Sequence, residues 1–193
     1  MRDGLLAKAQ AAIDGLKRAG ACTLVALDGR CAAGKTTLAA QLQAQTGCQV
    51  VHVDDFFLRP AQRTAERLRQ PGGNVDWERL LQEVLLPLRQ GLPASFCPYD
   101  CHTRSDRAPI HMAPDRLTLI EGSYSCHPQL WDFYDLHIFL TVSPQVQLRR
   151  IRKRNGTAGS EAFERQWIPL EERYFQAFSI EKRCELRLEA QEV

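Results

Sequence analysis

The sequence predicts an α/β fold of three layers, with helices on both faces of a mostly parallel, five-stranded sheet. Three observations lead to this prediction. Short apolar segments alternate along the chain with segments of helical periodicity. A glycine-rich turn at residues 29–36 joins the first apolar segment to a helix, and the acidic residues Asp54 and Glu121 follow two later apolar segments. Because such sheets bind ligands beyond the carboxyl ends of their strands, these residues are expected to meet in one cleft.

The bulk composition fits one domain spanning residues 1–193. With 25 basic and 23 acidic residues, the net charge of +2 indicates no general attraction to nucleic acid or membrane. The seven cysteines lack paired spacing, which is typical of free thiols in a reducing cytosol. No signal segment is found, and the longest apolar run, Leu136 to Val142, is too short to cross a bilayer. We therefore expect a soluble, cytoplasmic protein.

Glycines end both of the helices predicted before residue 50. The predicted elements are a helix at 2–18 ended by Gly20, a strand at 23–27, a helix at 35–45 closed by Gly47, and a strand at 49–53. Residues 59–75 lose clear periodicity and contain a Pro-Gly-Gly sequence, so we expect a mobile substrate flap there. Asp76 begins a helix with one apolar stripe, formed by Leu80, Leu81, Val84, Leu85 and Leu88.

The second half begins with residues 91–115, where four prolines predict an irregular, hairpin-like excursion. Strands are expected at 117–120, 136–142 and 184–188. Ser143 and Pro144 are a good start for a helix, with serine as its cap, and this helix should stop at Asn155 and Gly156. A last helical region at 163–178 contains Pro169, which should kink it.

Residues 29–36 fit the pattern G-x-x-x-x-G-K-[ST] of a phosphate-binding loop. Glycines allow backbone angles at which successive N–H groups turn toward phosphate oxygens, and the following helix directs its positive end at the same anion. Lys35 would supply charge near the outer phosphates, and the Thr36 hydroxyl would bind Mg²⁺. The predicted phosphate-binding residues are Gly29, Arg30, Cys31, Ala32, Ala33, Gly34, Lys35, Thr36 and Thr37. The alternative is a chance match in a turn rich in glycine and alanine.

Phosphoryl transfer also requires a group that accepts the proton of the attacking hydroxyl. Asp54 is the predicted proton acceptor, because it follows a strand that should lie beside the loop; a helix-capping role is the alternative, and Asp55 is the second choice. Glu121 is typical of the acidic residue that binds Mg²⁺, partly through water, although a hydrogen-bonded carboxylate at a strand end is the alternative.

Five basic residues lie between positions 149 and 154, just before a glycine-containing segment that ends at Ser160. We interpret residues 149–160 as a lid that closes arginines over the transferred phosphate. A solvated helix face is the simpler alternative. A nucleic-acid-binding patch is disfavoured, because no aromatic residues are interleaved with the charges.

The segments GRCAAGKTT, VDDFF, PYDCHTR, LIEGSYS and LRRIRKR together resemble the uridine kinase-like group, over residues 22–178. The resemblance implies a P-loop NTPase fold of the nucleoside and nucleotide kinase type, with Asp54 as catalytic base. It places Asp76 at a ribose hydroxyl, Tyr99 and His102 at a nucleobase with Arg104 nearby, and arginines of the lid at the phosphates. These lid residues are Arg149, Arg150 and Arg154.

The chain also departs from that group. The PYDCHTR segment is compressed, and Val146 stands where a lid arginine is expected. The resemblance therefore implies an ATP- and Mg²⁺-dependent kinase for a nucleoside-like small molecule, uridine or cytidine first. Nicotinamide riboside, pantothenate or a sugar is the alternative acceptor, and a nucleotide-binding regulator without turnover is the alternative class. No N-K-x-D motif favours a GTPase. No nucleic acid or membrane partner is expected, and a homo-oligomer is left open.

Overall fold

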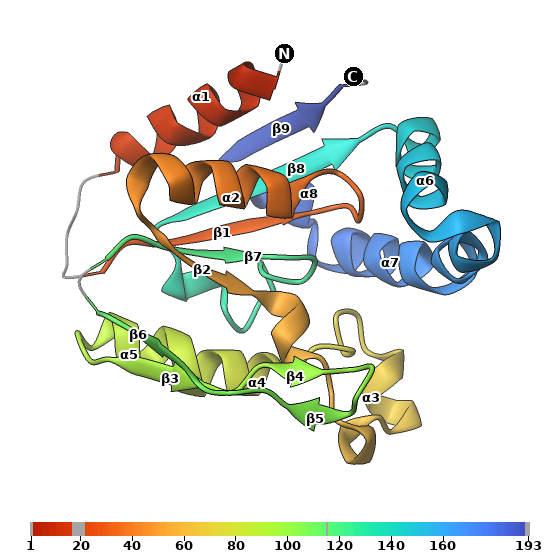
Figure 1. The fold of residues 1–193 in the computed structure, drawn as a ribbon, viewed down its shortest axis with the longest axis horizontal. Helices are drawn as coiled ribbons and strands as arrows, with labels where there is room; N and C mark the ends of the chain where they lie inside the picture. The colour runs from red at the N-terminus through yellow and green to blue at the C-terminus, as the bar shows by residue number, and fades with distance from the viewer. Residues whose placement is uncertain (1, 17–21, 115, 192–193) are drawn as a thin grey trace.

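The computed structural model describes residues 2–16, 22–114 and 116–191. A five-stranded sheet lies at its centre (Figure 1), in the order β2-β7-β1-β8-β9 and with every neighbouring pair parallel. The strands are β1 (Leu24–Gly29), β2 (Gln49–His52), β7 (Thr118–Glu121), β8 (Leu136–Val142) and β9 (Leu186–Ala190). This arrangement confirms the predicted α/β fold class.

Helices cover the sheet on both faces, because its strands are apolar on both sides. In β1, Val25 and Leu27 pack beneath α1 (Arg2–Asp14) and α2 (Lys35–Thr46), whereas Leu24 and Ala26 belong to the opposite core. That second core is completed by a continuous helical segment and by two helices near the C-terminus. The continuous segment comprises α4 (Trp77–Leu80), a π-helical turn (Leu81–Leu85) and α5 (Leu86–Arg89); the other two helices are α7 (Ile168–Phe178) and α8 (Ile180–Arg183).

Residues 91–114 form two small antiparallel pairs, which agrees with the hairpin-like excursion expected there. Strand β3 (Ala94–Phe96) pairs with β6 (Ile110–Met112), and β4 (Tyr99–Asp100) pairs with β5 (Ser105–Asp106). Both pairs lie on the α4 and α5 side of the molecule (Figure 1).

The segment predicted as an irregular flap contains helical turns at Pro60–Gln62 and α3 (Ala65–Arg69). Arg67 fixes it to the body of the protein: its guanidinium donates to both carboxylate oxygens of Glu78, at 2.6 and 2.7 Å, and to the backbone oxygen of Val75 at 2.9 Å. Contacts across the fold thus order helical turns in a segment that has no helical stripe, and its role as a mobile substrate flap stays a prediction.

The helix that contains the predicted lid is longer than expected. Helical backbone extends over α6 (Pro144–Ala162), and a π-helical turn (Phe163–Trp167) leads into α7. As predicted, Ser143 caps the start of α6 and the helix is interrupted at Gly156, whose φ of 70° and ψ of 179° are not helical. The chain then resumes helical backbone to Ala162, so the helix does not stop at Asn155 and Gly156 as expected, and the lid itself stays a prediction.

Two further predictions concern the first helix and membrane-spanning segments. The predicted end of the first helix at Gly20 lies outside the described residues. Within the described ranges, no helix has the length and apolar character needed to span a bilayer.

Candidate active site

The phosphate loop connects β1 to α2 at the carboxyl edge of the sheet, and two of its glycines have backbone angles that favour glycine. Gly29 has φ of 140°, and a Cβ atom there would lie 1.9 Å from the backbone oxygen of Leu140. Gly34, with φ of 106°, precedes α2 and offers the helix no side-chain cap. The N–H groups of the first turn of α2 are therefore left for another acceptor, as an anion-binding loop requires.

Lys35 is buried and bends back over the loop. Its Nζ atom donates to the backbone oxygens of Gly29 and Arg30, at 2.7 and 3.1 Å, and lies 3.2 Å from the Ser123 hydroxyl. These contacts hold the ammonium group at the mouth of the loop, where a phosphate chain would lie.

The two predicted magnesium ligands lie together. The Thr36 hydroxyl donates to Glu121 at 3.1 Å, which joins the start of α2 to the end of β7. On the other side of Glu121, His52 lies 2.5 Å from the same carboxylate oxygen, and this hydrogen bond is the largest influence that raises the pKa of His52. A hydroxyl and a carboxylate are hard oxygen donors that fit Mg²⁺ when phosphate and water complete its shell. His52 was not predicted.

Asp54 and Asp55 lie in a 3₁₀ turn (Val53–Phe56) directly after β2, and the structure distinguishes them. Asp54 lines a large cavity over the phosphate loop. Burial in that cleft raises its pKa, an effect that Glu121 reinforces and Lys35 opposes. Asp55 is buried and forms an ion pair with Arg107, so its carboxylate is already engaged. Of the two carboxylates, Asp54 lines the cavity and Asp55 does not.

The cavity has a volume of about 1440 Å³ and extends from the phosphate loop toward the β4–β5 hairpin. Tyr99, His102 and Arg104 of that hairpin line it, as the predicted acceptor pocket requires. Asp76 lies elsewhere: it is buried at the start of α4, where its carboxylate accepts from the backbone N–H of Arg79 at 3.1 Å and from Gln62 at 2.6 Å. Its contacts are those of a helix cap, and it is not among the cavity-lining residues.

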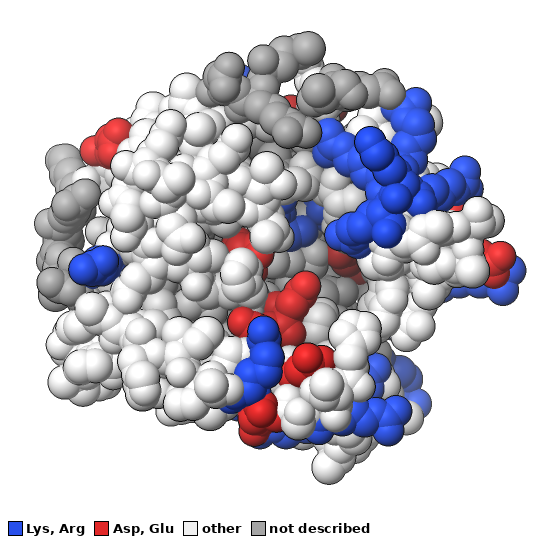
Figure 2. Space-filling view, in the orientation of Figure 1, with Lys and Arg blue, Asp and Glu red and all other residues white. Residues whose placement is uncertain are grey.

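The three predicted lid arginines of α6 have different surroundings. Arg154 lines the cavity. Arg150 also lines it and donates to the backbone oxygens of Ala32 and Ala33, at 3.1 and 3.2 Å, and so braces the loop. Arg149 is exposed and does not line the cavity. Basic residues gather on the α6 side of the hollow, and acidic residues lie inside it and below it (Figure 2).

Beneath the loop lies a buried carboxylate that sequence reasoning missed. Asp28 accepts from the backbone N–H groups of Gly29 and Cys126, at 2.7 and 2.9 Å, and from the Tyr174 hydroxyl at 2.9 Å. Burial raises its pKa to about 6, and these hydrogen bonds oppose that rise. Asp28 thus ties the loop to the turn after β7 and to α7. The sequence signal that could have identified this buried carboxylate is the aspartate at the end of the apolar run LVALD.

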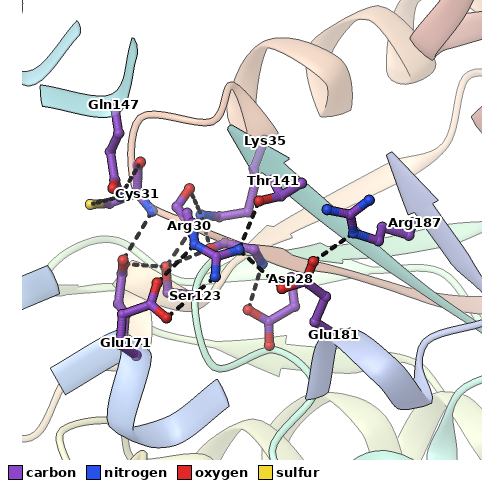
Figure 3. A network of polar contacts seen from close by, with 12 residues as sticks. Asp28, Arg30, Cys31, Lys35, Ser123, Thr141, Gln147, Glu171, Glu181 and Arg187 are labelled. Atoms are coloured by element: carbon purple, nitrogen blue, oxygen red, sulfur yellow. Dashed lines mark hydrogen bonds and ion pairs between the residues drawn. The ribbon is translucent and has the colours of Figure 1, made fainter. Parts of the chain in front are cut away.

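Helix α7 supplies two further acids that were not predicted. Glu172 binds the Arg30 guanidinium at 2.8 Å. Glu171 is buried, accepts from the backbone N–H of Cys31 at 3.0 Å, and accepts from the Ser123 hydroxyl at 2.6 Å (Figure 3). No local pattern in the sequence distinguishes these two residues.

The sheet order, the phosphate loop and the residues around it together define a P-loop fold. No protein-family model matches the chain, and no curated protein matches it in sequence. Among solved structures, a possible uridine kinase from Bacillus stearothermophilus matches with a TM-score of 0.74 at 22% identity, covering 97% of this chain and 98% of that one.

Two further structures are similar. A protein described as a fructose transport system kinase from Silicibacter sp. matches with a TM-score of 0.69 at 21% identity, covering 95% of this chain and 98% of that one. D-glycerate 3-kinase from Cryptococcus neoformans matches with a TM-score of 0.60 at 15% identity, covering 95% and 90%. The chain therefore has the fold of the uridine kinase-like P-loop kinases, which confirms the predicted resemblance at the level of fold.

Proposed function

We propose that the protein is a kinase that transfers a phosphoryl group from ATP, with Mg²⁺, to a primary hydroxyl of a small ribose-containing metabolite, uridine or cytidine first. The observation that carries the proposal is the convergence of the phosphate loop, Lys35, the Thr36–Glu121 pair and Asp54 on one cavity. A protein that only bound nucleotide would not need the proton acceptor in addition to the phosphate-binding groups.

In this proposal each group has a defined task. The loop N–H groups and Lys35 bind and orient the phosphates, which holds the transferred group in line with the acceptor. Thr36 and Glu121 would hold Mg²⁺, which neutralises phosphate charge when it is bound. Asp54 accepts the proton of the attacking hydroxyl; because its pKa is raised, it is a stronger base than an exposed aspartate. Arg154 reaches the same cavity from the lid.

A second candidate acceptor is a small anionic metabolite, such as a hydroxy acid or a sugar phosphate. Arg63 and Arg104 both line the cavity near His102, and neither forms an ion pair with any residue in the described ranges. Unpaired guanidinium groups suit carboxylate or phosphate. The similar structures are described as kinases connected with uridine, fructose and glycerate, so this fold accommodates acceptors of different charge.

The test is ATP consumption with Mg²⁺ in the presence of uridine, cytidine, nicotinamide riboside, pantothenate, glycerate or no acceptor. Turnover should require one acceptor and fall about a hundredfold or more in Asp54→Asn, while ATP binding stays nearly unchanged. Asp55→Asn is the matched control, since that residue is held by Arg107. A loss of turnover in the Asp55 variant alone would show that the proton acceptor is misassigned. ATP binding without turnover of any acceptor would favour the regulator.

A further inference from the structure

The Glu171 carboxylate already occupies one hydrogen-bonding position of the phosphate loop. Its Oε2 atom accepts from the backbone N–H of Cys31 at 3.0 Å, and the side chain lines the cavity into which the loop opens (Figure 3). Cys31 is the third residue of the loop, and its N–H is one of the groups that a phosphate-binding loop offers to an anion. Glu171 is therefore an internal anion in an anion-binding loop.

The position of Glu171 along the phosphate chain follows from its second contact. Its Oε1 atom accepts from the Ser123 hydroxyl at 2.6 Å, and Ser123 in turn lies 3.2 Å from Nζ of Lys35. The lysine of such loops reaches the outer phosphates. The carboxylate consequently lies at the end of the loop where the γ-phosphate of ATP would bind, and ADP would not extend to it.

The rest of α7 does not have to move for Glu171 to leave. The neighbouring Glu172 holds Arg30 at 2.8 Å, and Arg30 also donates to Glu181 at 3.2 Å and to Thr141 at 2.7 Å. This network fixes the helix to the loop independently of Glu171. A glutamate side chain can rotate about its own bonds, and the cavity of about 1440 Å³ beside it provides the space.

We propose that Glu171 is a specificity-determining residue that competes with the γ-phosphate for the phosphate loop, and so sets the relative affinity for ATP and ADP. The backbone N–H of Cys31 needs an acceptor, which the carboxylate provides. A γ-phosphate arriving at the same N–H meets a like charge and must displace it. After transfer, the carboxylate can return as the outer phosphate departs, which favours the ADP-bound loop. This inference rests on the proposed function, because it requires that the loop bind a nucleoside triphosphate.

The experiment is calorimetric titration of the full chain with ATP and with ADP, in the absence of an acceptor. Glu171→Gln keeps the shape and an oxygen that can accept from Cys31, but removes the charge. We expect this variant to bind ATP about tenfold more tightly and to change ADP affinity less than about twofold. The matched control is Glu172→Gln, which alters the adjacent acid without a contact to a loop N–H and should leave the ATP-to-ADP ratio of affinities unchanged.

Each outcome has a distinct meaning. An unchanged ratio in Glu171→Gln, or weaker ATP binding, would overturn the competition. If thermal unfolding shows that this variant does not fold, Glu171→Asp is used in the same assay. Its shorter side chain cannot span to Cys31, so the ratio should again shift toward ATP, and an unshifted ratio would refute the inference. A wild-type chain that binds neither nucleotide would remove the proposed function itself, which separates the two failures.

Discussion

Replacement of Asp28 by asparagine tests how the phosphate loop is supported from below. The substitution keeps the size of a fully buried side chain and removes its charge. The carboxylate accepts from three backbone N–H groups, of Gly29, Tyr124 and Cys126, and from the Tyr174 hydroxyl. An asparagine would place its NH₂ group against at least one of these donors. We expect the free energy of unfolding at acidic pH, below about pH 4, to fall by roughly 1–3 kcal/mol.

The pH dependence of this effect follows from the raised pKa. Burial raises the pKa of Asp28 from 3.8 to about 6, so as pH rises from about 4 to about 6 the unfolded chain releases this proton before the folded chain does. Ionisation then stabilises the unfolded state, and the stabilisation that Asp28 provides at low pH is lost through this window. At about 1.4 kcal/mol per pKa unit, the loss amounts to about 3 kcal/mol.

The quantity to measure is the difference in unfolding free energy between wild type and Asp28→Asn, taken from urea titrations at several pH values. The wild-type curve alone is insufficient, because His127 acts in the opposite direction. Burial lowers the pKa of His127 to about 4, so its contribution to stability is lost as pH falls below its ordinary value of 6.5. The difference removes this background, since both chains contain His127.

The difference should fall by about 3 kcal/mol between about pH 3.5 and about pH 7. Asp132→Asn, which changes an exposed aspartate, is the control and should not reproduce the fall. A difference that stays flat across this range, or that rises with pH, would refute the reasoning about Asp28.

Three further outcomes are expected. Gly29→Ala should abolish nucleotide binding and lower the unfolding free energy by roughly 2–4 kcal/mol, because the new Cβ would lie 1.9 Å from a backbone oxygen. Gly4→Ala is the control, because a Cβ atom at Gly4 has no atom within 4 Å. Iodoacetamide should label exposed Cys101 before Cys31, because burial raises the pKa of Cys31 to about 12, and ATP should slow Cys31 labelling further; equal rates with and without ATP would contradict occupancy of the loop. Asp76→Ala should cost roughly 1–2 kcal/mol of stability as a lost helix cap, and a raised KM for the acceptor would show a ribose-binding role as well.

The strands and the phosphate loop could be predicted because their signals are local. A strand buried on both faces is a continuous apolar run, and the predicted 136–142 matches Leu136–Val142. The strand before the loop was expected to end at Leu27 and continues to Gly29, because the backbone keeps pairing with β8 up to that glycine. The loop itself is specified by glycines, a lysine and a threonine at fixed spacing.

The buried acids around the loop could not be predicted in the same way. Glu171 is 140 residues from Cys31 in the chain, and Tyr174 is 146 residues from Asp28. Nothing in their local sequence marks these partners, since the contacts exist only once α7 packs against the edge of the sheet. The helical turns within the predicted flap were missed for the same reason, because Arg67 orders this segment through contacts with residues outside its own helix.

The pairing of the acidic residues indicates which of them are structural. Asp55 is held by Arg107 and Glu172 by Arg30, so a second charge already compensates each carboxylate. Asp54, Glu121 and Glu171 line the cavity, and none of them forms an ion pair with an arginine or lysine in the part of the chain that the structure describes. These three carboxylates would repel a triphosphate that binds in this part of the cavity.

The attraction must therefore come from groups aimed at the phosphates themselves: the loop N–H groups, Lys35 and the basic side of the hollow over α6 (Figure 2). Acidic residues inside the cavity and basic residues on its α6 side suit two different tasks, which a surface of one charge could not perform together. In the proposed reaction, the basic side would favour the arrival of phosphate, and the acidic side would keep a carboxylate free to accept a proton beside it. The three acids that no arginine or lysine pairs with are therefore the ones whose replacement should change nucleotide affinity or turnover more than stability.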